Sequence, residues 1–326
     1  MTNWAETKKL ELHLHLEGAA PPALVRRLGV EKNMDLGGLF DESGRYASND
    51  FTSFLRAYER MSAVFSAPED YRALTEAVLR EAASHGVIYA EIFLSPTSLG
   101  YDPAAWGEML AAIEEGADRA EAECGVLCRF IPVAIRHHAP EDAVKLAGML
   151  ANAPRGRMTG FGLAGDERIG APGDWAPAFA RAHEAGFRLT AHAGEFGGPE
   201  SVGAALDDLK VERIGHGVRS AEDASLVDRL AEEGITLETC PGSNVALGVY
   251  PDLAAHPVRR LFDAGCRVTV STDDPPFFHT TMSLEYARLA DEHGFSGEDF
   301  DAMLSNAIDA AFCDEATKSQ LRRAVV

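Results

Sequence analysis

The chain has 326 residues, 46% of them hydrophobic and 25% charged, with a formal net charge of −21 at pH 7. These proportions are typical of a globular enzyme with a large core, and so acidic a surface repels polyanions, which excludes nucleic acid as an expected partner. Because no run of 18 apolar residues is present and the first residues lack the apolar stretch of a signal peptide, we expect no membrane partner and a cytoplasmic location.

Apolar runs of strand length alternate with amphipathic stretches from one end of the chain to the other. Eight strands are expected, at 10–16, 87–94, 127–135, 159–164, 188–193, 213–217, 236–239 and 267–271. Helices are expected between them, at 68–84, 103–124, 140–151, 174–185, 199–209, 221–233 and 256–264. Several of these helices begin at or just after Asp, Ser or Pro and stop at Gly, as helix termini commonly do.

The strict alternation of strand and helix predicts parallel strands joined by crossover helices. Eight such units in this length predict an α/β fold, a single (β/α)8 barrel of the TIM type that spans residues 1–326 as one domain. An open doubly wound sheet is the alternative, but no Gly-x-Gly-x-x-Gly turn follows the first strand. Residues 31–67 are too long for a plain loop and contain a helical pattern at 51–64, which predicts a helical lid inserted after strand one. Residues 282–326 are expected to add further helices on the outside.

Titratable residues follow five of the eight predicted strands, where a barrel enzyme places its catalytic groups. The five strand ends are HLHLEG (13–18), GLAGDE (162–167), TAHAGE (190–195), IGHG (214–217) and STDDP (271–275). His13 and His15 stand two residues apart on one strand, so both imidazoles face the same side. Since apolar side chains are the default at buried strand ends, the sequence predicts a polar site in the barrel mouth.

His13, His15 and His192, with one of Asp273 or Asp274, form a set of three histidines and one carboxylate that converges on one point. Neutral imidazole and carboxylate are ligands of divalent transition metals, and zinc is the expected ion. A zinc-bound water has a pKa of about 7, so such a site makes hydroxide at neutral pH. Binuclear barrels typically need a modified Lys on strand four, and GFGLAGDE has none, so one ion per chain is expected.

Glu195 and His216 are expected beside this set. Glu195 can coordinate the metal, or it can act as a general acid or base with a raised pKa. His216 can be a further ligand, an orienting group beside the nucleophile, or a side chain that forms a hydrogen bond at the barrel mouth. The cytidine-deaminase signature does not fit, because HAGE has the wrong spacing and Cys240 is followed by PGSN without a second Cys.

The motifs HLHLEG, LAGDE, HAGE, IGHG and STDDP, in this order, resemble those of the adenosine deaminase family of metal-dependent amidohydrolases. The resemblance covers nearly the whole chain, including FTSFL in the predicted lid and GVIYAEIFLSP at strand two. It implies an enzyme that adds hydroxide at C6 of a purine, forms a tetrahedral intermediate and releases ammonia.

The resemblance also implies a role for each matching residue. The metal ligands would be His13, His15, His192 and Asp273. Asp273 would also be a catalytic residue, and His15 would also line the substrate pocket. The catalytic pair would be Glu195, which donates a proton to purine N1, and His216, which holds and polarises the hydroxide. The remaining pocket residues would be Asp274 with a hydrogen bond at N7, the Gly165 N–H at N3, Glu17 at a ribose hydroxyl, and Phe51, Phe54 and Leu55 as an apolar roof.

The substrate depends on two motifs that disagree. Nucleoside-deaminating members usually carry Asp where this chain has Glu17, and related adenine deaminases often show Glu there and a CPxSN similar to TCPGSN. The intact AGDE at 164–167 resembles the adenosine type. Giving AGDE more weight, we expect adenosine and 2′-deoxyadenosine as substrates, with adenine or another 6-aminopurine derivative as the alternative.

Two further alternatives are an amidohydrolase that cleaves a different C–N bond and a non-catalytic purine-binding barrel. The expected partner is a small-molecule purine nucleoside or base, since the arginine pairs at 26–27, 259–260 and 322–323 are too dispersed to bind a phosphate. An oligomer is possible, but nothing in the sequence indicates its size.

Overall fold

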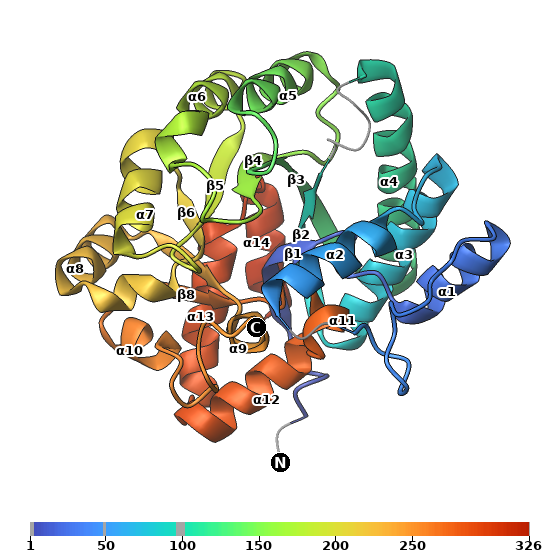
Figure 1. Ribbon diagram of the computed structural model, residues 1–326. Helices are drawn as coiled ribbons and strands as arrows, with labels where there is room; N and C mark the ends of the chain where they lie inside the picture. The colour runs from blue at the N-terminus through green and yellow to red at the C-terminus, as the bar shows by residue number, and fades with distance from the viewer. Residues whose placement is uncertain (1–2, 48–49, 96–101, 326) are drawn as a thin grey trace.

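Eight parallel strands form the centre of the molecule in the computed structural model, which describes residues 3–47, 50–95 and 102–325. The strands are β1 (Lys9–His15), β2 (Val87–Leu94), β3 (Leu127–Ile135), β4 (Gly160–Ala164), β5 (Arg188–Ala193), β6 (Arg213–His216), β7 (Thr236–Thr239) and β8 (Arg267–Val270). Each pairs with the next in chain order, β1 to β8, and the helices surround them (Figure 1). The predicted TIM-type barrel is confirmed, and every predicted strand end lies within one residue of the observed one.

The barrel closes between β8 and β1 through the backbone of one site residue. The His15 N–H donates to the Asp273 carbonyl at 3.1 Å, and the Asp273 N–H donates to the His13 carbonyl at 3.1 Å. Below this point, the Leu12 N–H donates to the Ser271 hydroxyl at 3.2 Å. The two metal-candidate histidines and Asp273 are therefore placed by the seam of the barrel itself.

The connecting helices begin and end much as their sequences predict. They are α3 (Pro68–Ser84), α4 (Pro103–Cys124), α5 (Pro140–Asn152), α6 (Ala176–Glu184), α7 (Pro199–Ala204), α8 (Ala224–Glu233) and α10 (Val258–Asp263). A further short helix that was not predicted, α9 (Pro241–Ala246), follows β7. Pro occupies the first turn of most of them, where its missing N–H costs nothing. The helix expected over 199–209 continues beyond α7 as a π-helical turn, η3 (Ala205–Leu209), and the one expected over 174–185 begins as a 3-10 turn, η2 (Pro172–Trp175).

The expected lid segment after β1 contains α2 (Phe51–Ser62), preceded by α1 (Pro22–Glu31), which sequence analysis did not identify. Asp50 caps α2 by accepting from the Ser53 N–H at 2.8 Å, while the Ser53 hydroxyl caps the Asp50 N–H at 3.0 Å. This reciprocal capping box fixes where the helix starts. Residues 48–49 of the expected lid lie outside the described residues.

The extra helices expected over 282–326 are α12 (Met282–His293), α13 (Gly297–Ala310) and α14 (Glu315–Ala324). A short helix that the sequence analysis did not predict, α11 (Pro275–Phe278), precedes them. Helix α13 packs on β8 and β1. Phe312, between α13 and α14, packs with Phe93, Ile131 and Val133 of the barrel strands. Within the described part of the chain, no helix is both long enough and apolar enough to cross a bilayer.

Candidate active site

The predicted metal ligands converge where the strands end. The His15 Nε2 atom lies 3.2 Å from Asp273 Oδ1 and 3.2 Å from His192 Nε2. The His13 Nε2 atom lies 3.5 Å from the same Asp273 oxygen. His216 joins the cluster, since His13, His192, His216 and Asp273 each offer a ligand atom within 4.8 Å of the others. The structure thus brings together all four residues that the family resemblance assigns to the metal.

Neighbouring groups aim these rings at the centre of the cluster. The Nδ1 atom of His13 lies 2.8 Å from Glu238 Oε2, and that of His192 lies 2.9 Å from the Leu163 carbonyl oxygen, so both rings turn their Nε2 atoms inward. Such second contacts of imidazole ligands fix the ring and its tautomer. The Ser243 hydroxyl donates to Asp273 Oδ2 at 2.7 Å. The donor set is therefore held in place by protein contacts.

The cluster fits a divalent metal ion. Although His13 is fully buried, its Nε2 atom has no hydrogen-bond partner among the described residues. Burial, followed by the charge of His13, lowers the pKa of His192 well below its ordinary value, which leaves a neutral nitrogen donor. Burial by itself raises the pKa of Asp273, but the neighbouring His13 and His15 rings hold it well below its ordinary value. Imidazole nitrogens around a charged carboxylate are the donors that zinc prefers.

Glu195 lies beside this cluster and has the raised pKa of a proton donor. Its side chain is buried, and burial, with the negative charge of Asp273, raises its pKa well above the ordinary value. Its Oε1 atom lies 3.7 Å from His216 Nδ1 and accepts from the Asn244 amide at 3.4 Å. A buried carboxyl that keeps its proton near neutral pH can act as a proton donor.

Glu167, in the AGDE motif, holds the loop that carries Glu195. Its carboxylate accepts from the backbone N–H groups of residues 194, 195, 196 and 197, the last three at 2.8–2.9 Å, and from Ser201. The neighbouring Asp166 forms a two-pronged ion pair with the exposed Arg168, with both contacts at 2.8 Å. Both acidic residues of AGDE therefore support loops at the barrel mouth.

The predicted pocket residues are placed as follows. Gly165 has φ +95°, and a Cβ there would lie 3.2 Å from the backbone nitrogen of Arg136, so only glycine suits the position.

Asp274 is buried, and its Oδ1 atom lacks a hydrogen-bond partner in the described ranges. Burial and then the charge of Asp273 raise the pKa of Asp274 well above its ordinary value, which makes it a hydrogen-bond donor. A Cβ on Gly18 would lie 1.4 Å from that oxygen, so Gly18 makes room for Asp274.

Glu17 has a protein partner. The Tyr71 hydroxyl of α3 donates to Glu17 Oε1 at 3.2 Å, and the carboxyl is buried. Burial raises the pKa of Glu17 to about 7. The acidic side chain expected at a ribose hydroxyl is thus already engaged by an aromatic side chain.

The three lid residues do not share one role. Phe54 is buried, with its ring 5.3 Å and 5.1 Å from Phe277 and Phe278, which follow Asp274 in α11. The ring of Phe51 lies 4.5 Å from that of Phe196, next to Glu195. Leu55 is partly buried and packs against the main hydrophobic core. The ring contacts of Phe51 and Phe54 reach the residues that follow two strand ends, which suits an apolar roof.

Sequence reasoning missed several residues behind the site. Asn244 lies between Glu195 and His216, and His256 lies behind Asn244. Glu238, inside β7, supports His13. The signal for Asn244 was present in TCPGSN at the end of strand seven, which was used only to compare families.

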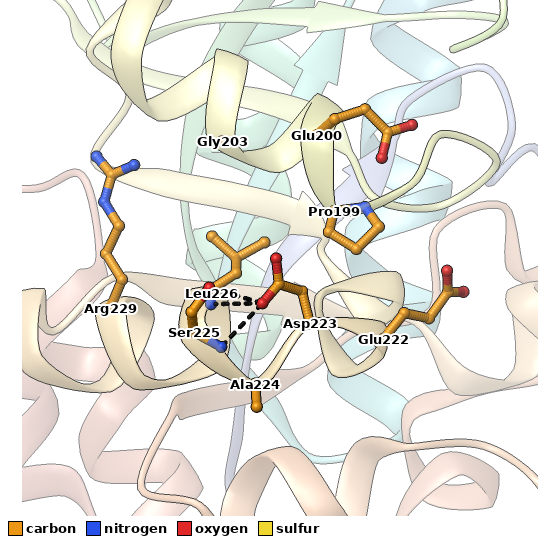
Figure 2. Close-up of a pocket in the computed structure, with 9 residues that line it drawn as sticks. All are labelled: Pro199, Glu200, Gly203, Glu222, Asp223, Ala224, Ser225, Leu226 and Arg229. Carbon is orange, nitrogen blue, oxygen red and sulfur yellow. Dashed lines mark hydrogen bonds between the residues drawn. The ribbon is translucent and has the colours of Figure 1, made fainter.

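A surface hollow outside this cluster lies between α7 and the start of α8 (Figure 2). Asp223 there accepts from the backbone N–H groups of Ser225 and Leu226 as the cap of α8. Glu200 and Glu222 also line the hollow. Glu222 forms an ion pair with Arg219, with contacts of 2.7 and 3.0 Å, and Asp223 caps a helix, so the strand-end cluster is the candidate active site.

Comparisons with known proteins agree with this geometry. A family model described as adenosine deaminase matches residues 8–326. The adenine deaminase of Rhizobium leguminosarum bv. trifolii is 48% identical over 96% of this chain and 97% of that protein. The adenine deaminase of Agrobacterium fabrum is 46% identical over 96% of both chains.

These relatives show that the expectation of adenosine as the substrate is wrong. Proteins nearly half identical to this one over almost the whole chain are adenine deaminases. The expectation depended on AGDE, but both acidic residues of this motif have structural partners. Glu167 accepts backbone N–H groups of the neighbouring loop, and Asp166 forms an ion pair with Arg168. The motif therefore says little about which purine the pocket accepts, whereas Glu17 and TCPGSN pointed to the alternative.

Solved structures lead to the same family. The crystal structure of adenine deaminase from Arthrobacter aurescens superposes with a TM-score of 0.88 at 31% identity, covering 98% of each chain. An amidohydrolase from Burkholderia ambifaria with bound zinc superposes with a TM-score of 0.90 at 28% identity, covering 100% of this chain and 92% of that one. The predicted class, a metal-binding hydrolase that removes an amino group from a 6-aminopurine, is confirmed, and the chain belongs to the adenosine deaminase family.

Proposed function

We propose that this protein is an adenine deaminase, which converts adenine and water into hypoxanthine and ammonia. The observation that carries the proposal is the match of nearly the whole chain to adenine deaminases at 46–48% identity. The contact between Tyr71 and Glu17 supports it. Free adenine has no ribose hydroxyl, so the carboxyl at this position needs a partner from the protein, and Tyr71 supplies one.

We further propose that His13, His15, His192 and Asp273 hold one zinc ion per chain. The partnerless nitrogen of His13 and the zinc bound by the Burkholderia amidohydrolase support this assignment. When bound, zinc supplies Lewis acidity that makes hydroxide available near neutral pH.

Glu195 would carry the proton transfers, and His216 would orient the attacking oxygen. Glu195, protonated because it is buried near Asp273, would donate to the purine ring nitrogen beside C6 and so make C6 electrophilic. His216, buried 3.7 Å from Glu195, would orient the attacking oxygen by a hydrogen bond. The proton of the hydroxyl group added at C6 then passes to the amino group, which leaves as ammonia while C6 becomes a carbonyl carbon. The other proton of the water restores the Glu195 carboxyl group, so the reaction balances.

The pocket walls would hold and shield the base. A protonated Asp274 would donate to N7, and the Gly165 N–H would reach N3. Phe51 and Phe54 would cover the purine and exclude water, which strengthens the hydrogen bonds beneath them.

Purified protein loaded with zinc tests the proposal in two measurements. Elemental analysis should give about one zinc per chain, and His13→Ala should lose both the zinc and the activity while staying folded. The ratio kcat/KM, followed by ultraviolet absorbance, should be at least about 100-fold higher for adenine than for adenosine, about 2.7 kcal/mol of discrimination. A preference for adenosine, or a metal content near two, would contradict the proposal.

A further inference from the structure

Asn244 contacts both the proposed proton donor, Glu195, and the residue proposed to orient the attacking oxygen, His216. It lies in α9, directly after β7, and its side chain is fully buried. Its Nδ2 atom lies 3.2 Å from His216 Nδ1 and 3.4 Å from Glu195 Oε1. Its Oδ1 atom lies 3.1 Å from His256 Nε2. One amide thus contacts three titratable side chains.

The backbone settles the direction of these hydrogen bonds. The Val258 N–H can only donate, and it donates to His256 Nδ1 at 3.2 Å. Burial lowers the pKa of His256 to about 3, so the ring is neutral and its single proton lies on Nε2. That Nε2–H donates to Asn244 Oδ1. A flipped amide would set two donors against each other, so the orientation of Asn244 is fixed by Val258 through His256.

Two consequences follow at the site. Both N–H groups of the Asn244 amide point to the catalytic side, so His216 Nδ1 accepts and the ring carries its proton on Nε2. With Nδ1 engaged and Nε2 protonated, neutral His216 has no lone pair for a metal and is a hydrogen-bond donor instead of a fifth ligand. On Glu195, Oε1 accepts from Asn244, which leaves Oε2 to carry the acid proton.

We propose that Asn244, held by His256, is a positioning residue that places the proton of His216 on Nε2 and that of Glu195 on Oε2. This inference rests on the proposed function, because it assigns those two protons to deamination. Neither Asn244 nor His256 has to touch the purine for it to hold. Asn244 would act by setting the direction of two hydrogen bonds at the site. Its loss should therefore lower kcat more than it changes KM.

The decisive measurement is the tautomer of His216 in the zinc-loaded wild type, read from imidazole ¹⁵N NMR shifts, with His216→Gln used to assign the signals. We expect protonated Nε2 and unprotonated Nδ1. In Asn244→Leu, which has similar bulk and no donor, His216 should shift toward the Nδ1–H form, because Glu195 Oε1 is then its nearest acceptor, at 3.7 Å. A wild-type ring protonated at Nδ1, or a tautomer unchanged in Asn244→Leu, overturns the inference.

Kinetics with adenine give an independent readout. Asn244→Leu should lose about 100-fold in kcat with KM changed less than about threefold. His256→Phe, which cannot orient the amide, should lose about tenfold, and His256→Gln, which can accept from Val258 and donate to Asn244, should restore most of that loss. Equal losses in His256→Phe and His256→Gln would contradict the relay and leave His256 a packing role.

Controls separate this inference from the proposed function. Asn306→Leu removes an amide that donates to the Val268 carbonyl outside the site, at 3.3 Å, and should leave kcat and the His216 signals unchanged. If wild-type protein does not act on adenine, the proposed function fails, while the NMR result still decides the tautomer. If wild type is active and Asn244→Leu keeps full kcat, the inference alone fails.

Discussion

Two clusters of buried charge lie inside the same barrel, and they are built in opposite ways. In the lower cluster, Arg213 lies between two glutamates, with Nη1 2.6 Å from Glu91 Oε2 and Nε 2.6 Å from Glu238 Oε1. Its guanidinium carbon lies 3.6 Å from the centre of the Phe312 ring. Burial by itself lowers the pKa of Arg213, but Glu91 and Glu238 raise it above its ordinary value. Each charge in this cluster faces an opposite charge.

The upper cluster, at the strand ends, brings like charges together. Glu195 and Asp274 are both buried close to Asp273, and burial and the Asp273 charge raise the pKa of each well above its ordinary value. His216 and Asp273 also have left-handed backbones, with φ 61° and 67°. Groups held in rarely populated conformations and shifted protonation states are typical of catalytic sites.

Glu238 joins the two clusters, because its Oε1 atom contacts Arg213 and its Oε2 atom contacts His13. The comparison teaches that burial of charge has two uses in this barrel. The lower cluster pairs its charges and holds the strands, and the upper cluster leaves its donors for a metal and a substrate. Substitutions in the upper cluster should therefore cost activity, and those in the lower cluster should cost stability.

The largest effect is expected for Glu195→Gln, which removes the acid proton and keeps the shape. Turnover should fall by about 1,000-fold or more, since general acid catalysis is lost. Zinc content and the affinity for a product such as hypoxanthine should stay the same, measured by elemental analysis and calorimetry. The matched control is Glu200→Gln in the surface hollow, which should keep full activity. Loss of zinc in Glu195→Gln would mean that Glu195 is a ligand, and the role assigned to it would be wrong.

Next in size is Arg213→Met, which breaks the lower cluster. Leaving Glu91 and Glu238 buried without their partner should lower the free energy of unfolding by about 3–5 kcal/mol, measured by urea denaturation. Arg188→Met is the matched control, because Arg188 also lies over Phe312 but pairs with Glu212 at the surface, where an ion pair contributes about 0–1 kcal/mol. Equal losses in the two variants would contradict the distinction between paired burial and surface pairing.

Sequence patterns predicted the upper cluster better than the lower one. His13, His192 and Asp273 were found because polar residues stood at strand ends that are apolar by default. Arg213 and Glu238 could not be paired from sequence, because a charged residue inside a short strand does not reveal which neighbour faces it. Their pairing depends on strand register, such as Gly215 beside Glu238, which only the closed barrel fixes.

Function was predicted to the family level, and the substrate was missed for a physical reason. AGDE resembles the adenosine type and therefore favoured adenosine, but Glu167 accepts backbone N–H groups of the next loop. Nothing in the letters of a motif separates a residue that contacts substrate from one that supports its neighbour. The roles of Asn244 and His256 were missed likewise, because they depend on a backbone N–H at Val258.

A third, smaller effect concerns Glu11, which lies on β1 below His13 and accepts from the Thr272 N–H at 3.1 Å. Burial raises its pKa from 4.5 to about 7. Between pH 4.5 and about 7 the folded protein keeps a proton that the unfolded chain releases. The free energy of unfolding therefore falls as the pH rises through this range, and above about pH 7 Glu11 causes no further loss. Glu11→Gln should match wild type near pH 4.5 and be about 1–3 kcal/mol more stable at pH 8, measured by urea denaturation. If the free energies of unfolding of Glu11→Gln and wild type differed by the same amount at every pH in this range, Glu11 would titrate normally. It would then belong with the paired charges of the lower cluster.

The smallest effect is expected at the roof of the upper cluster, in Phe51→Ala. Phe51 is partly exposed, and its ring contacts Phe196 and lies 5.3 Å from the guanidinium carbon of Arg168. Losing this contact should raise KM for adenine about fivefold, about 1 kcal/mol, with kcat and the free energy of unfolding nearly unchanged, because the ring closes the site without filling the core. Phe54→Ala is the contrasting variant, since its buried ring should cost about 3–5 kcal/mol of stability. If Phe51→Ala lost stability with KM unchanged, α2 would be a packed part of the barrel and the upper cluster would have no separate roof.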